Sequence, residues 1–554
     1  MANPLFDRHR ALLDRALQAI AERSYWSAFP ESPSPKIYGE GAAEAGKAAF
    51  DALLGKPFPL KQAGTIGSVG GEMSPYGMAL GVEYPKVDLD ALFASVDRAQ
   101  ATWRKAGPEA WVGVALEILS RINKHSFEIA HAVMHTTGQA FVMSFQAGCP
   151  HAQDRALEAI AYAWDQMRRV PAKASWEKPQ GKNEPLKMEK HFRVVPRGVS
   201  LVIGCNTFPT WNAYPGLFAS LATGNAVVVK PHPNATLPLA ITVQIAREVL
   251  TEAGFDADVV TLVAHAAGDA TAQQLALRPE VKIIDFTGSR ANGDWLEANA
   301  RHAQVYTEKA GVNQIVLDSA QDFARVARNI AFSLALYTGQ MCTAPQNIYV
   351  ARGGIDTASG HLSFDEVAQA LSAAVQKLVG DPARAVEILG AVVNDGVAAR
   401  IETARGLGTL VLDSQDLAHP QYPQARIRTP MIVRLDAADR ETYLKEWFGP
   451  VAFLIATDGT AQSLDIARQA VKEHGALTLS VYSTDDGVIE QAIEVAEDAG
   501  VALSINLTSG VFVNQSAAFS DFHGTGANPA ANAALTDAAF VASRFRVVQH
   551  RMHV

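Results

Sequence analysis

The sequence predicts an α/β protein built on doubly wound parallel sheets. Three observations predict this class. Apolar, strand-like segments alternate with helical segments through the middle of the chain, a second α/β series follows them, and 554 residues exceed one ordinary hydrophobic core. We therefore expect at least two domains, with ligands bound at the carboxyl ends of the strands.

The first 85 residues are predicted to form an N-terminal extension. Leu13, Leu17 and Ile20 share one face of a helix over residues 8–22. Gly, Pro and Ser are frequent over residues 30–81, where periodicity is low, so this stretch is expected to be irregular. Helical patterns then resume over four segments, at residues 89–106, 111–125, 126–137 and 152–168.

A pair of alternating segments predicts strands that leave the main fold. Five lysines between Lys173 and Lys190 lie in a connector with Pro and Gly, which we interpret as a solvated linker rather than an anion-steering patch. Apolar residues over 186–194 then keep a period of two, and residues 544–547 also alternate. Because lone strands need partners, we expect an oligomerisation arm near residues 186–195 and a homodimer or dimer of dimers.

The middle of the chain gives the clearest α/β pattern. Gly224 is placed to end a helix, as a glycine after a C-cap does. Helices are predicted over residues 238–253 and 268–277, with a third opening at Ser289. Strands are predicted at Ser200–Gly204, Ala226–Val229, Val259–Val263 and Val281–Phe286. We expect residues 86–310 to form a nucleotide-binding domain.

A second α/β series follows and is predicted to form a catalytic domain over residues 311–520, with a C-terminal segment at 521–554. Its strands are expected at residues 315–317, 451–455 and 477–481, and its helices at residues 323–337, 461–473 and 488–499.

Composition restricts the partners. The net charge of −9 disfavours nucleic acid or an anionic membrane surface as the main partner. The three cysteines show no CxxC spacing, and Cys149 and Cys205 are expected to be buried. The charged N-terminus lacks the apolar core of a signal peptide, and no apolar run reaches the roughly 20 residues that span a bilayer. We expect a cytoplasmic protein, no membrane association and no metal, since no histidine pair has metal-ligand spacing.

Cys342 and Glu308 are the candidate catalytic pair. A thiolate can attack a carbonyl carbon, and a carboxylate can later activate water to release the thioester. Gly288 and Ser289 lie where a predicted strand passes into a helix, a place where free amides favour phosphate. Lys230 closes a strand and could bond a ribose or a phosphate. The chain lacks a GxGxxG after its strands, so the ordinary dinucleotide fingerprint is absent.

Taken together, these segments resemble the aldehyde dehydrogenase superfamily over roughly residues 85–550. The order of the matching segments is specific to that family: Asn206-Thr207-Phe208-Pro209, Gly224-Asn225-Ala226-Val227-Val228-Val229-Lys230-Pro231, Phe286-Thr287-Gly288-Ser289, Glu308, Gly339-Gln340-Met341-Cys342 and Glu446-Trp447-Phe448-Gly449-Pro450. The long N-terminal region and the local variants look most like the phenylacetate-degradation branch of PaaN type.

The resemblance implies a role for each matching residue. Cys342 would be the nucleophile that forms a thiohemiacetal and then a thioester, Glu308 the base for the deacylating water and Asn206 the oxyanion donor. Glu446 and Phe448 would hold the nicotinamide ribose and pack near the ring. Lys230 would lie at the adenosine ribose, with Gly288 and Ser289 at the pyrophosphate. NAD or NADP would be the cofactor, and a small aldehyde, in the PaaN branch a semialdehyde linked to coenzyme A, would be the substrate.

Three departures from the family pattern leave questions open. Thr207 interrupts the usual Asn-Phe-Pro, so either Asn206 or Thr207 could serve the oxyanion. Lys309 beside Glu308 could depress the carboxyl pKa or point to solvent. The family's Lys-Pro-x-Glu reads Lys230-Pro231-His232-Pro233, so Pro233 stands where a carboxylate often binds ribose hydroxyls, which removes a repulsion against the 2′-phosphate of NADP.

Two alternatives to aldehyde oxidation remain. A CoA-acylating dehydrogenase would transfer the acyl group from Cys342 to a thiol, although such transfer does not need the water-activating base that Glu308 supplies. A non-catalytic scaffold that binds nucleotide would not need Cys342, Glu308 and Glu446 together.

Overall fold

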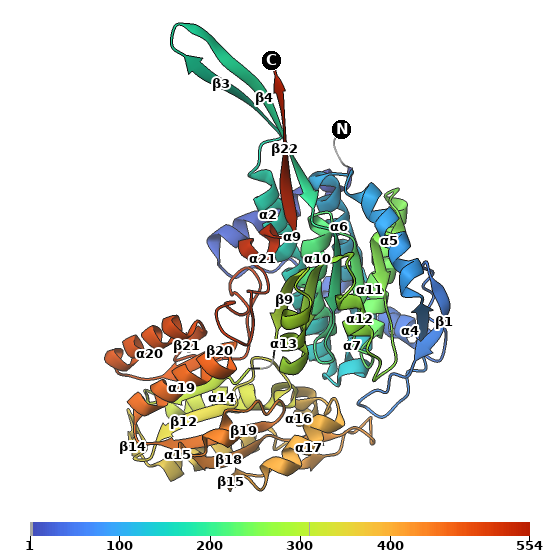
Figure 1. Ribbon diagram of the computed structural model, residues 1–554. Coiled ribbons are helices and arrows are strands. Elements are labelled where there is room, and N and C mark those ends of the chain that lie inside the picture. The colour runs from blue at the N-terminus through green and yellow to red at the C-terminus, as the bar shows by residue number, and fades with distance from the viewer. Residues whose placement is uncertain (1–3, 310) are drawn as a thin grey trace.

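The computed structural model describes residues 4–309 and 311–554 and contains two parallel sheets, one above the other, with an arm that projects from the body (Figure 1). Ala310, at the predicted boundary between the domains, lies outside the described residues. Among the described residues, no helix combines the length and the apolar character that a membrane span requires.

The first sheet has five parallel strands in the order β7-β6-β5-β8-β9. Apolar residues alternate between its faces: Val202 and Val229 pack under one helical layer, and Leu201 and Val228 under the other, so both faces are buried. The predicted parallel sheet is confirmed. Its strands are β5 (Val199–Ile203), β6 (Val227–Lys230), β7 (Val260–Leu262), β8 (Val281–Thr287) and β9 (Gln304–Glu308).

Helices cover both faces of the first sheet. One layer is formed by α6 (Pro108–Lys124), α9 (Ala152–Arg168), α10 (Pro209–Ala222) and α11 (Leu237–Glu252), and the other by α5 (Leu89–Trp103), α12 (Thr271–Ala276) and α13 (Arg290–Asn299). Gly224 follows the C-cap of α10 with a φ of +84°, as predicted. A Cβ there would lie 2.6 Å from the Trp111 ring, so only glycine fits both the turn and the packing.

The second sheet has seven strands in the order β15-β18-β19-β12-β10-β20-β21, parallel except for the edge strand β15. Two hydrophobic cores bury its faces. Its strands are β10 (Gln314–Leu317), β12 (Asn347–Ala351), β15 (Thr409–Leu412), β18 (Met431–Asp436), β19 (Val451–Thr457), β20 (Thr478–Tyr482) and β21 (Ala502–Ile505), and its main helices are α14 (Phe323–Ala335), α15 (Phe364–Leu378), α17 (Asp395–Ala404), α19 (Thr460–His474) and α20 (Asp486–Ala499).

The expectation of irregular chain over residues 30–81 is wrong. Helices α3 (Pro35–Tyr38) and α4 (Ala42–Leu53) and strand β1 (Thr65–Gly70) lie there, after α1 (Pro4–Arg8) and α2 (Arg10–Glu22), and β1 pairs with β2 (Glu83–Val87). Helix α4 is rich in alanine and buries one aromatic side chain, Phe50, so its apolar periodicity is weak. Gly46 brings α4 close to α7 (Ser126–Thr137), because a Cβ there would lie 2.3 Å from Cβ of Phe127.

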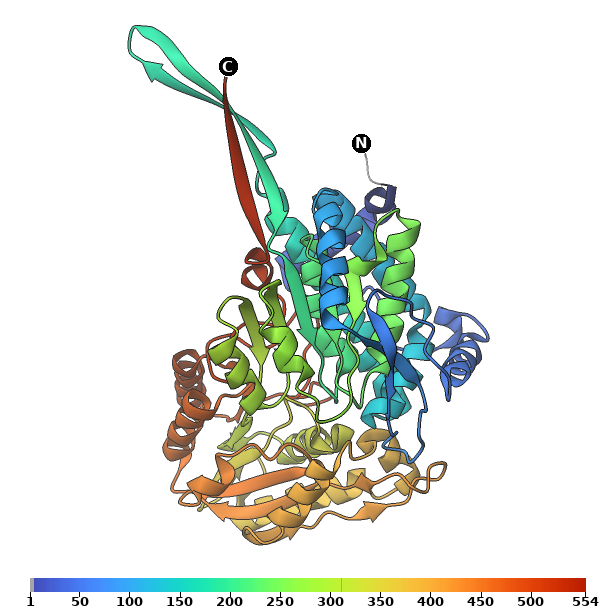
Figure 2. The same cartoon turned by 45° about the vertical axis from the view of Figure 1, so that its right-hand side comes forward.

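The predicted linker at the lysine-rich segment is also wrong, whereas the two predicted arm strands are confirmed as strands. Strand β4 (Asn183–Pro196) pairs with β3 (Lys173–Gln180) on one side and with β22 (Phe545–His553) on the other, both antiparallel. Figures 1 and 2 show this three-stranded arm leaving the body. A strand exposed on both faces tolerates lysine, so a lysine-rich sequence does not exclude a strand.

Candidate active site

Glu308 is the last residue of β9, at the carboxyl end of the first sheet. Its side chain is 4% exposed, and its Oε2 accepts a hydrogen bond of 3.1 Å from Nδ2 of Asn212 on α10. Its Oε1 has no hydrogen-bond partner of good geometry among the described residues. A buried carboxylate oxygen without a hydrogen bond is costly, so this atom points to chemistry rather than to structure.

Cys342 follows a backbone segment in an unusual conformation. Helix α14 leads into a short 3₁₀ turn, Leu336–Gly339, in which Tyr337 and Thr338 have φ of 51° and 54°. Left-handed conformations cost about 1–3 kcal/mol for such residues, and they persist only where the surroundings impose them. Thr338 Oγ1 donates to the Leu389 carbonyl at 2.7 Å, and Asn313 Nδ2 donates to the Cys342 carbonyl at 2.7 Å. The thiol is therefore presented from a fixed turn.

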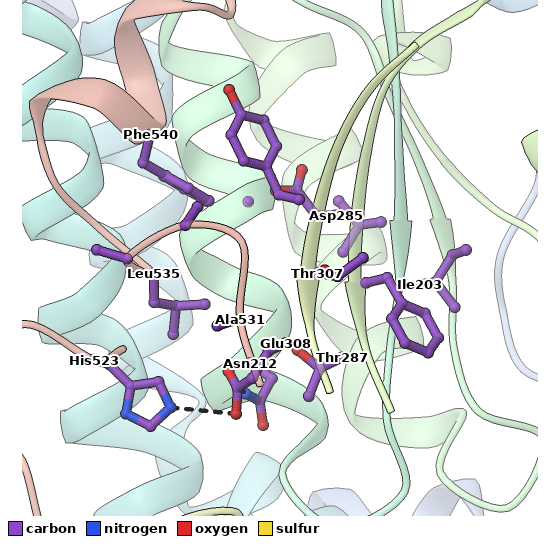
Figure 3. Close-up of a pocket in the computed structure, with 16 residues that line it drawn as sticks. Ile203, Asn212, Asp285, Thr287, Thr307, Glu308, His523, Ala531, Leu535 and Phe540 are labelled. Atoms are coloured by element: carbon purple, nitrogen blue, oxygen red, sulfur yellow. Dashed lines mark hydrogen bonds and ion pairs between the residues drawn. The ribbon is translucent and has the colours of Figure 1, made fainter. Parts of the chain in front are cut away.

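A third group, His523, completes the site and is absent from the sequence prediction. Its Nε2 lies 3.8 Å from Sγ of Cys342 and 3.2 Å from Oε1 of Glu308. The ring is 5% exposed and packs edge-on against Trp211, with centroids 4.6 Å apart. Figure 3 shows His523, from the C-terminal part of the chain, pointing at the Glu308 carboxylate. No motif marks this histidine, because only the folded chain brings it to the other two residues.

The pKa values of Cys342 and Glu308 are shifted by burial and by this proximity. Burial and the neighbouring Glu308 carboxylate raise the pKa of the Cys342 thiol well above its ordinary value. Burial alone would raise the pKa of Glu308 too, but the nearby His523 side chain brings it below its ordinary value. The carboxylate is thus ionised, and the thiol keeps its proton unless a neighbouring base accepts it.

The same three groups are the candidates for holding a metal ion. One donor atom each of Glu308, Cys342 and His523 lies within 4.8 Å of the others, and Zn²⁺ accepts all three donor types. An ion there would block the thiol from a carbonyl. The absence of a metal stays a prediction.

Two cavities meet these groups. The larger, about 650 Å³, is open at one side and reaches Cys342 and His523. Its wall includes Trp26 and Glu31 of the N-terminal extension and Phe208 and Trp211 of the first α/β unit. The smaller, about 20 Å³, lies against Glu308, Asn212 and Thr287 (Figure 3) and has room for about one water molecule.

The predicted cofactor residues fall at the carboxyl ends of strands. Lys230 ends β6 and is 5% exposed, and its ammonium group makes no hydrogen bond or ion pair with any described residue; burial lowers its pKa to about 8. Gly288 follows β8, and Ser289 is the N-cap of α13 without a capping bond from its side chain, which leaves amides of that helix free. A buried cation without a partner and a free helix start form a site for an anionic ligand.

Glu446 and Phe448 lie on the other side of the cleft, in the segment before β19. Burial raises the pKa of Glu446 to about 7 although Arg400 lies near and the Gly311 N–H donates to it. Phe448 packs on Val393 and Val397. A carboxylate so placed can accept hydrogen bonds from hydroxyl groups of a ligand.

Asn206 and Lys309 differ in whether their positions fit the roles expected of them. Asn206 Nδ2 donates to the Thr136 carbonyl at 3.2 Å, so one of its two N–H groups is engaged and one remains. Lys309 neither contacts the Glu308 carboxyl nor points to solvent: its Nζ lies 2.9 Å from Asp294 and from Glu297. Both expectations for Lys309 are wrong, since two acids on α13 draw it away.

Comparison with known proteins identifies the family. Residues 82–532 match the model of the aldehyde dehydrogenase family. The 1-pyrroline-5-carboxylate dehydrogenase of Geobacillus thermodenitrificans is 26% identical over 411 residues, which cover 72% of this chain and 74% of that protein. The vanillin dehydrogenase of Corynebacterium glutamicum is 25% identical over 431 residues, covering 76% and 82%.

Solved structures agree. The crystal structure of an NAD-dependent aldehyde dehydrogenase from Burkholderia multivorans is 68% identical, has a TM-score of 0.99 and covers 100% of both chains. A 1-pyrroline-5-carboxylate dehydrogenase from Thermus thermophilus, 21% identical with a TM-score of 0.73, covers 96% of this chain and 99% of its own and shows the shared fold. With the family match spanning most of its length, this chain belongs to the aldehyde dehydrogenase family.

Proposed function

We propose that this protein oxidises an aldehyde to a carboxylic acid with NAD or NADP, through a covalent intermediate on Cys342. The observation that carries the proposal is the Cys342 sulfur at the end of a cavity of about 650 Å³, with a buried carboxylate and an imidazole within 4.8 Å. A scaffold protein has no need of a thiol at a cavity wall with a partly unbonded carboxylate within 4.8 Å of it.

The residues divide the reaction into two stages. The Cys342 sulfur attacks the carbonyl carbon, and the remaining N–H of Asn206 is the proposed donor to the oxyanion. After oxidation the acyl group stays on sulfur as a thioester. Glu308, held by Asn212, then takes a proton from a water molecule that attacks the thioester and releases the acid.

The residues around the cleft fit a nicotinamide dinucleotide. Lys230 and the free amides at the start of α13 suit the ribose and pyrophosphate, and Glu446 suits the hydroxyls of the second ribose. When bound, the dinucleotide supplies the hydride acceptor. The protein from Burkholderia multivorans is NAD-dependent. Pro233 stands at the position where the family often has a carboxylate, so we propose that NADP is accepted as well.

The cavity wall restricts the substrate. Among the described residues that line it are six aromatic side chains and three acids, and none is lysine or arginine: Tyr25, Trp26, Phe208, Trp211, Phe332 and Phe512, with Glu31, Asp154 and Asp521. A carboxylate or phosphate on the substrate would meet no lysine or arginine along this wall. We therefore propose a neutral aldehyde, aromatic or with a long aliphatic chain.

The side chains of the cavity wall also decide how well two candidate substrates would fit. The 1-pyrroline-5-carboxylate named for relatives carries a carboxylate, for which the described cavity wall offers no lysine or arginine. A semialdehyde linked to coenzyme A, which the PaaN resemblance implies, could place its acyl part in the cavity only with its phosphates outside. We keep it as the second candidate substrate.

The free thiols of all three cysteines also fit a reducing cytoplasm, where we propose that the protein works.

The test is the Cys342→Ala variant assayed with both dinucleotides. Aldehyde oxidation should fall by roughly four orders of magnitude or more, because the atom that forms the covalent bond is gone. Fluorescence titration with NADPH and NADH should give binding constants within about twofold of the wild type. Reduced nicotinamide formed at an undiminished rate by the variant would refute the mechanism.

The substrate arm of the experiment compares kcat/KM for benzaldehyde, glutamate semialdehyde and a CoA-linked semialdehyde, with and without free coenzyme A. The proposal expects the neutral aldehyde to exceed glutamate semialdehyde and expects no consumption of the free thiol. Consumption of coenzyme A would instead identify an acylating dehydrogenase.

A further inference from the structure

The thiol of Cys342 needs a base, and this need sets the role of His523. The thiol is desolvated and faces a carboxylate, both of which disfavour the thiolate. Only the thiolate is an effective nucleophile. Glu308 is a poor candidate for this base, because transfer of the thiol proton to it would neutralise the carboxylate that must later activate water.

We propose that His523 takes the proton of the Cys342 thiol and holds it, as an imidazolium braced by Glu308, until the thioester breaks. This inference rests on the proposed function and extends it by one catalytic residue.

The geometry favours Nε2 of His523 as the atom that accepts the proton. It lies 3.8 Å from Sγ, within the range for a thiol hydrogen bond, and the ring is fixed by its edge-on packing against Trp211. The Arg155 guanidinium lies 5.6 Å from the centroid of that indole. Arg155 also donates a hydrogen bond to the backbone carbonyl of Asp521, two residues before His523. The imidazole therefore reaches the sulfur without rearrangement.

Oε1 of Glu308 explains why the charged imidazole is stable there. This oxygen is buried and lacks a hydrogen bond of good geometry, and Nε2 of His523 lies 3.2 Å from it. Once Nε2 carries the proton, the N–H can donate to Oε1, and the carboxylate balances the positive ring. Charge separation thus supplies the donor that the buried oxygen otherwise lacks.

The proton balance closes over one turnover. In acylation the S–H bond breaks, the proton moves to Nε2, and the sulfur pair forms the C–S bond while the carbonyl electrons move to oxygen. Those electrons then restore the C=O bond as the C–H bond breaks and hydride leaves the carbon, which the dinucleotide would accept when bound, so that a thioester remains. In deacylation Glu308 takes a proton from water, the C–S bond breaks, and the leaving sulfur recovers the proton from Nε2. Glu308 then releases its proton to solvent, so each turnover yields one acid and returns the thiol.

The experiment measures alkylation of Cys342 by iodoacetamide across pH on the full-length enzyme, followed at the Cys342 peptide by mass spectrometry. His523→Gln keeps an N–H donor but cannot accept the proton. Its alkylation near neutral pH should be about 100-fold slower than in the wild type and should climb steadily as the solution becomes alkaline. His302→Gln, the same change at an exposed histidine, is the matched control and should follow the wild type.

Steady-state and burst kinetics separate a base from a packing residue. His523→Gln should slow the burst of reduced nicotinamide by about 100-fold with little change in the KM for aldehyde, and His523→Ala should regain rate when free imidazole is added. Identical alkylation profiles in His523→Gln and wild type would overturn the proposal.

A measurement on the native fold covers the case in which the variants do not fold. The ultraviolet absorbance of the thiolate, taken as wild type minus Cys342→Ala, should already be present at neutral pH. Its absence until strongly alkaline pH would also overturn the proposal. If the wild type itself oxidises no aldehyde, the proposed function fails instead, whatever the alkylation profile shows.

Discussion

Glu446 illustrates how one buried acid can set the pH range of a binding site. It lies behind the cleft with a pKa of about 7, raised by burial and only partly offset by Arg400. Below that pH the side chain is mostly protonated, and above it the carboxylate is available to ribose hydroxyls. If it serves the dinucleotide as proposed, cofactor binding must weaken as the solution becomes acidic.

For Glu446 we predict that the dissociation constant for NADPH rises about tenfold from one pH unit above 7 to one unit below, because the fraction of ionised carboxylate falls by that factor. Glu446→Gln should bind more weakly and lose this dependence. Titration of dinucleotide fluorescence in both proteins checks it. Lys230, whose pKa is about 8, is common to both, so its effect cancels in the ratio. An equal slope in the two proteins would exclude Glu446 from the site.

At the residue scale, sequence motifs located the pair Cys342 and Glu308 but not the whole site. Both lie in segments with recognisable neighbours, and the structure brings their donor atoms within 4.8 Å of each other. His523 lies 181 positions after Cys342 and has no such context. Lys309 shows the opposite case: its neighbour in sequence is Glu308, yet its partners are two acids on a helix. Adjacency in sequence does not fix where a long side chain goes.

The N-terminal extension is the element that shapes the cavity. Trp26 packs edge-on against Phe519, with centroids 4.8 Å apart, and lines the wall that leads to Cys342. The segment is anchored on helix α9, where Arg23 pairs with Glu158 at 3.0 Å and Ser27 donates to Asp154 at 2.5 Å. An extension without an evident role in sequence thus becomes part of the substrate site.

We predict that Trp26→Ala changes specificity more than rate. Removing the indole enlarges the cavity, so kcat/KM for bulky aromatic aldehydes relative to small ones should rise by about tenfold, the usual effect of remodelling an apolar pocket. Initial rates with a series of aldehydes of increasing size measure the ratio. Ile37→Ala, at an exposed position of the same extension, is the control. An unchanged ratio would remove Trp26 from the substrate wall.

At the element scale, the central α/β pattern was predictable because strands buried on both faces read as apolar runs. The strands β5, β6, β8 and β10 all fall where they were expected. The pattern fails where burial is one-sided or absent, as in the lysine-rich β3 and in the alanine-rich α4. These elements are defined by their neighbours, not by their own sequence.

At the scale of the whole molecule, the arm is the part that the fold itself does not bury. Its strands β3, β4 and β22 project from the body (Figure 2). They expose apolar side chains. Leu186, Val548 and Met552 are 45%, 44% and 51% exposed. Exposed apolar strands are a liability in a monomer, so we propose that the arm packs against another copy of the chain in a dimer or dimer of dimers.

Assembly should depend on those side chains. We predict that Val548→Lys combined with Met552→Lys lowers the mass in solution to that of a monomer, since charge replaces the apolar contact, while Cys342 stays reactive toward iodoacetamide. Light scattering after size-exclusion chromatography measures the mass. Ile493→Lys, at an exposed position on α20 away from the arm, is the control. A monomeric wild type, or an intact oligomer in the double variant, would contradict this role.

The strained turn before Cys342 has one more consequence. Gly339 packs directly against Gly449, because a Cβ at Gly339 would lie 2.5 Å from the carbonyl oxygen of Gly449. Gly449 directly follows Glu446-Trp447-Phe448. The nucleophile's loop and the segment facing the dinucleotide are therefore in rigid backbone contact. Thermodynamic linkage is reciprocal, so whatever the bound dinucleotide does to the energy of the sulfur, a chemical modification of the sulfur does equally to dinucleotide affinity.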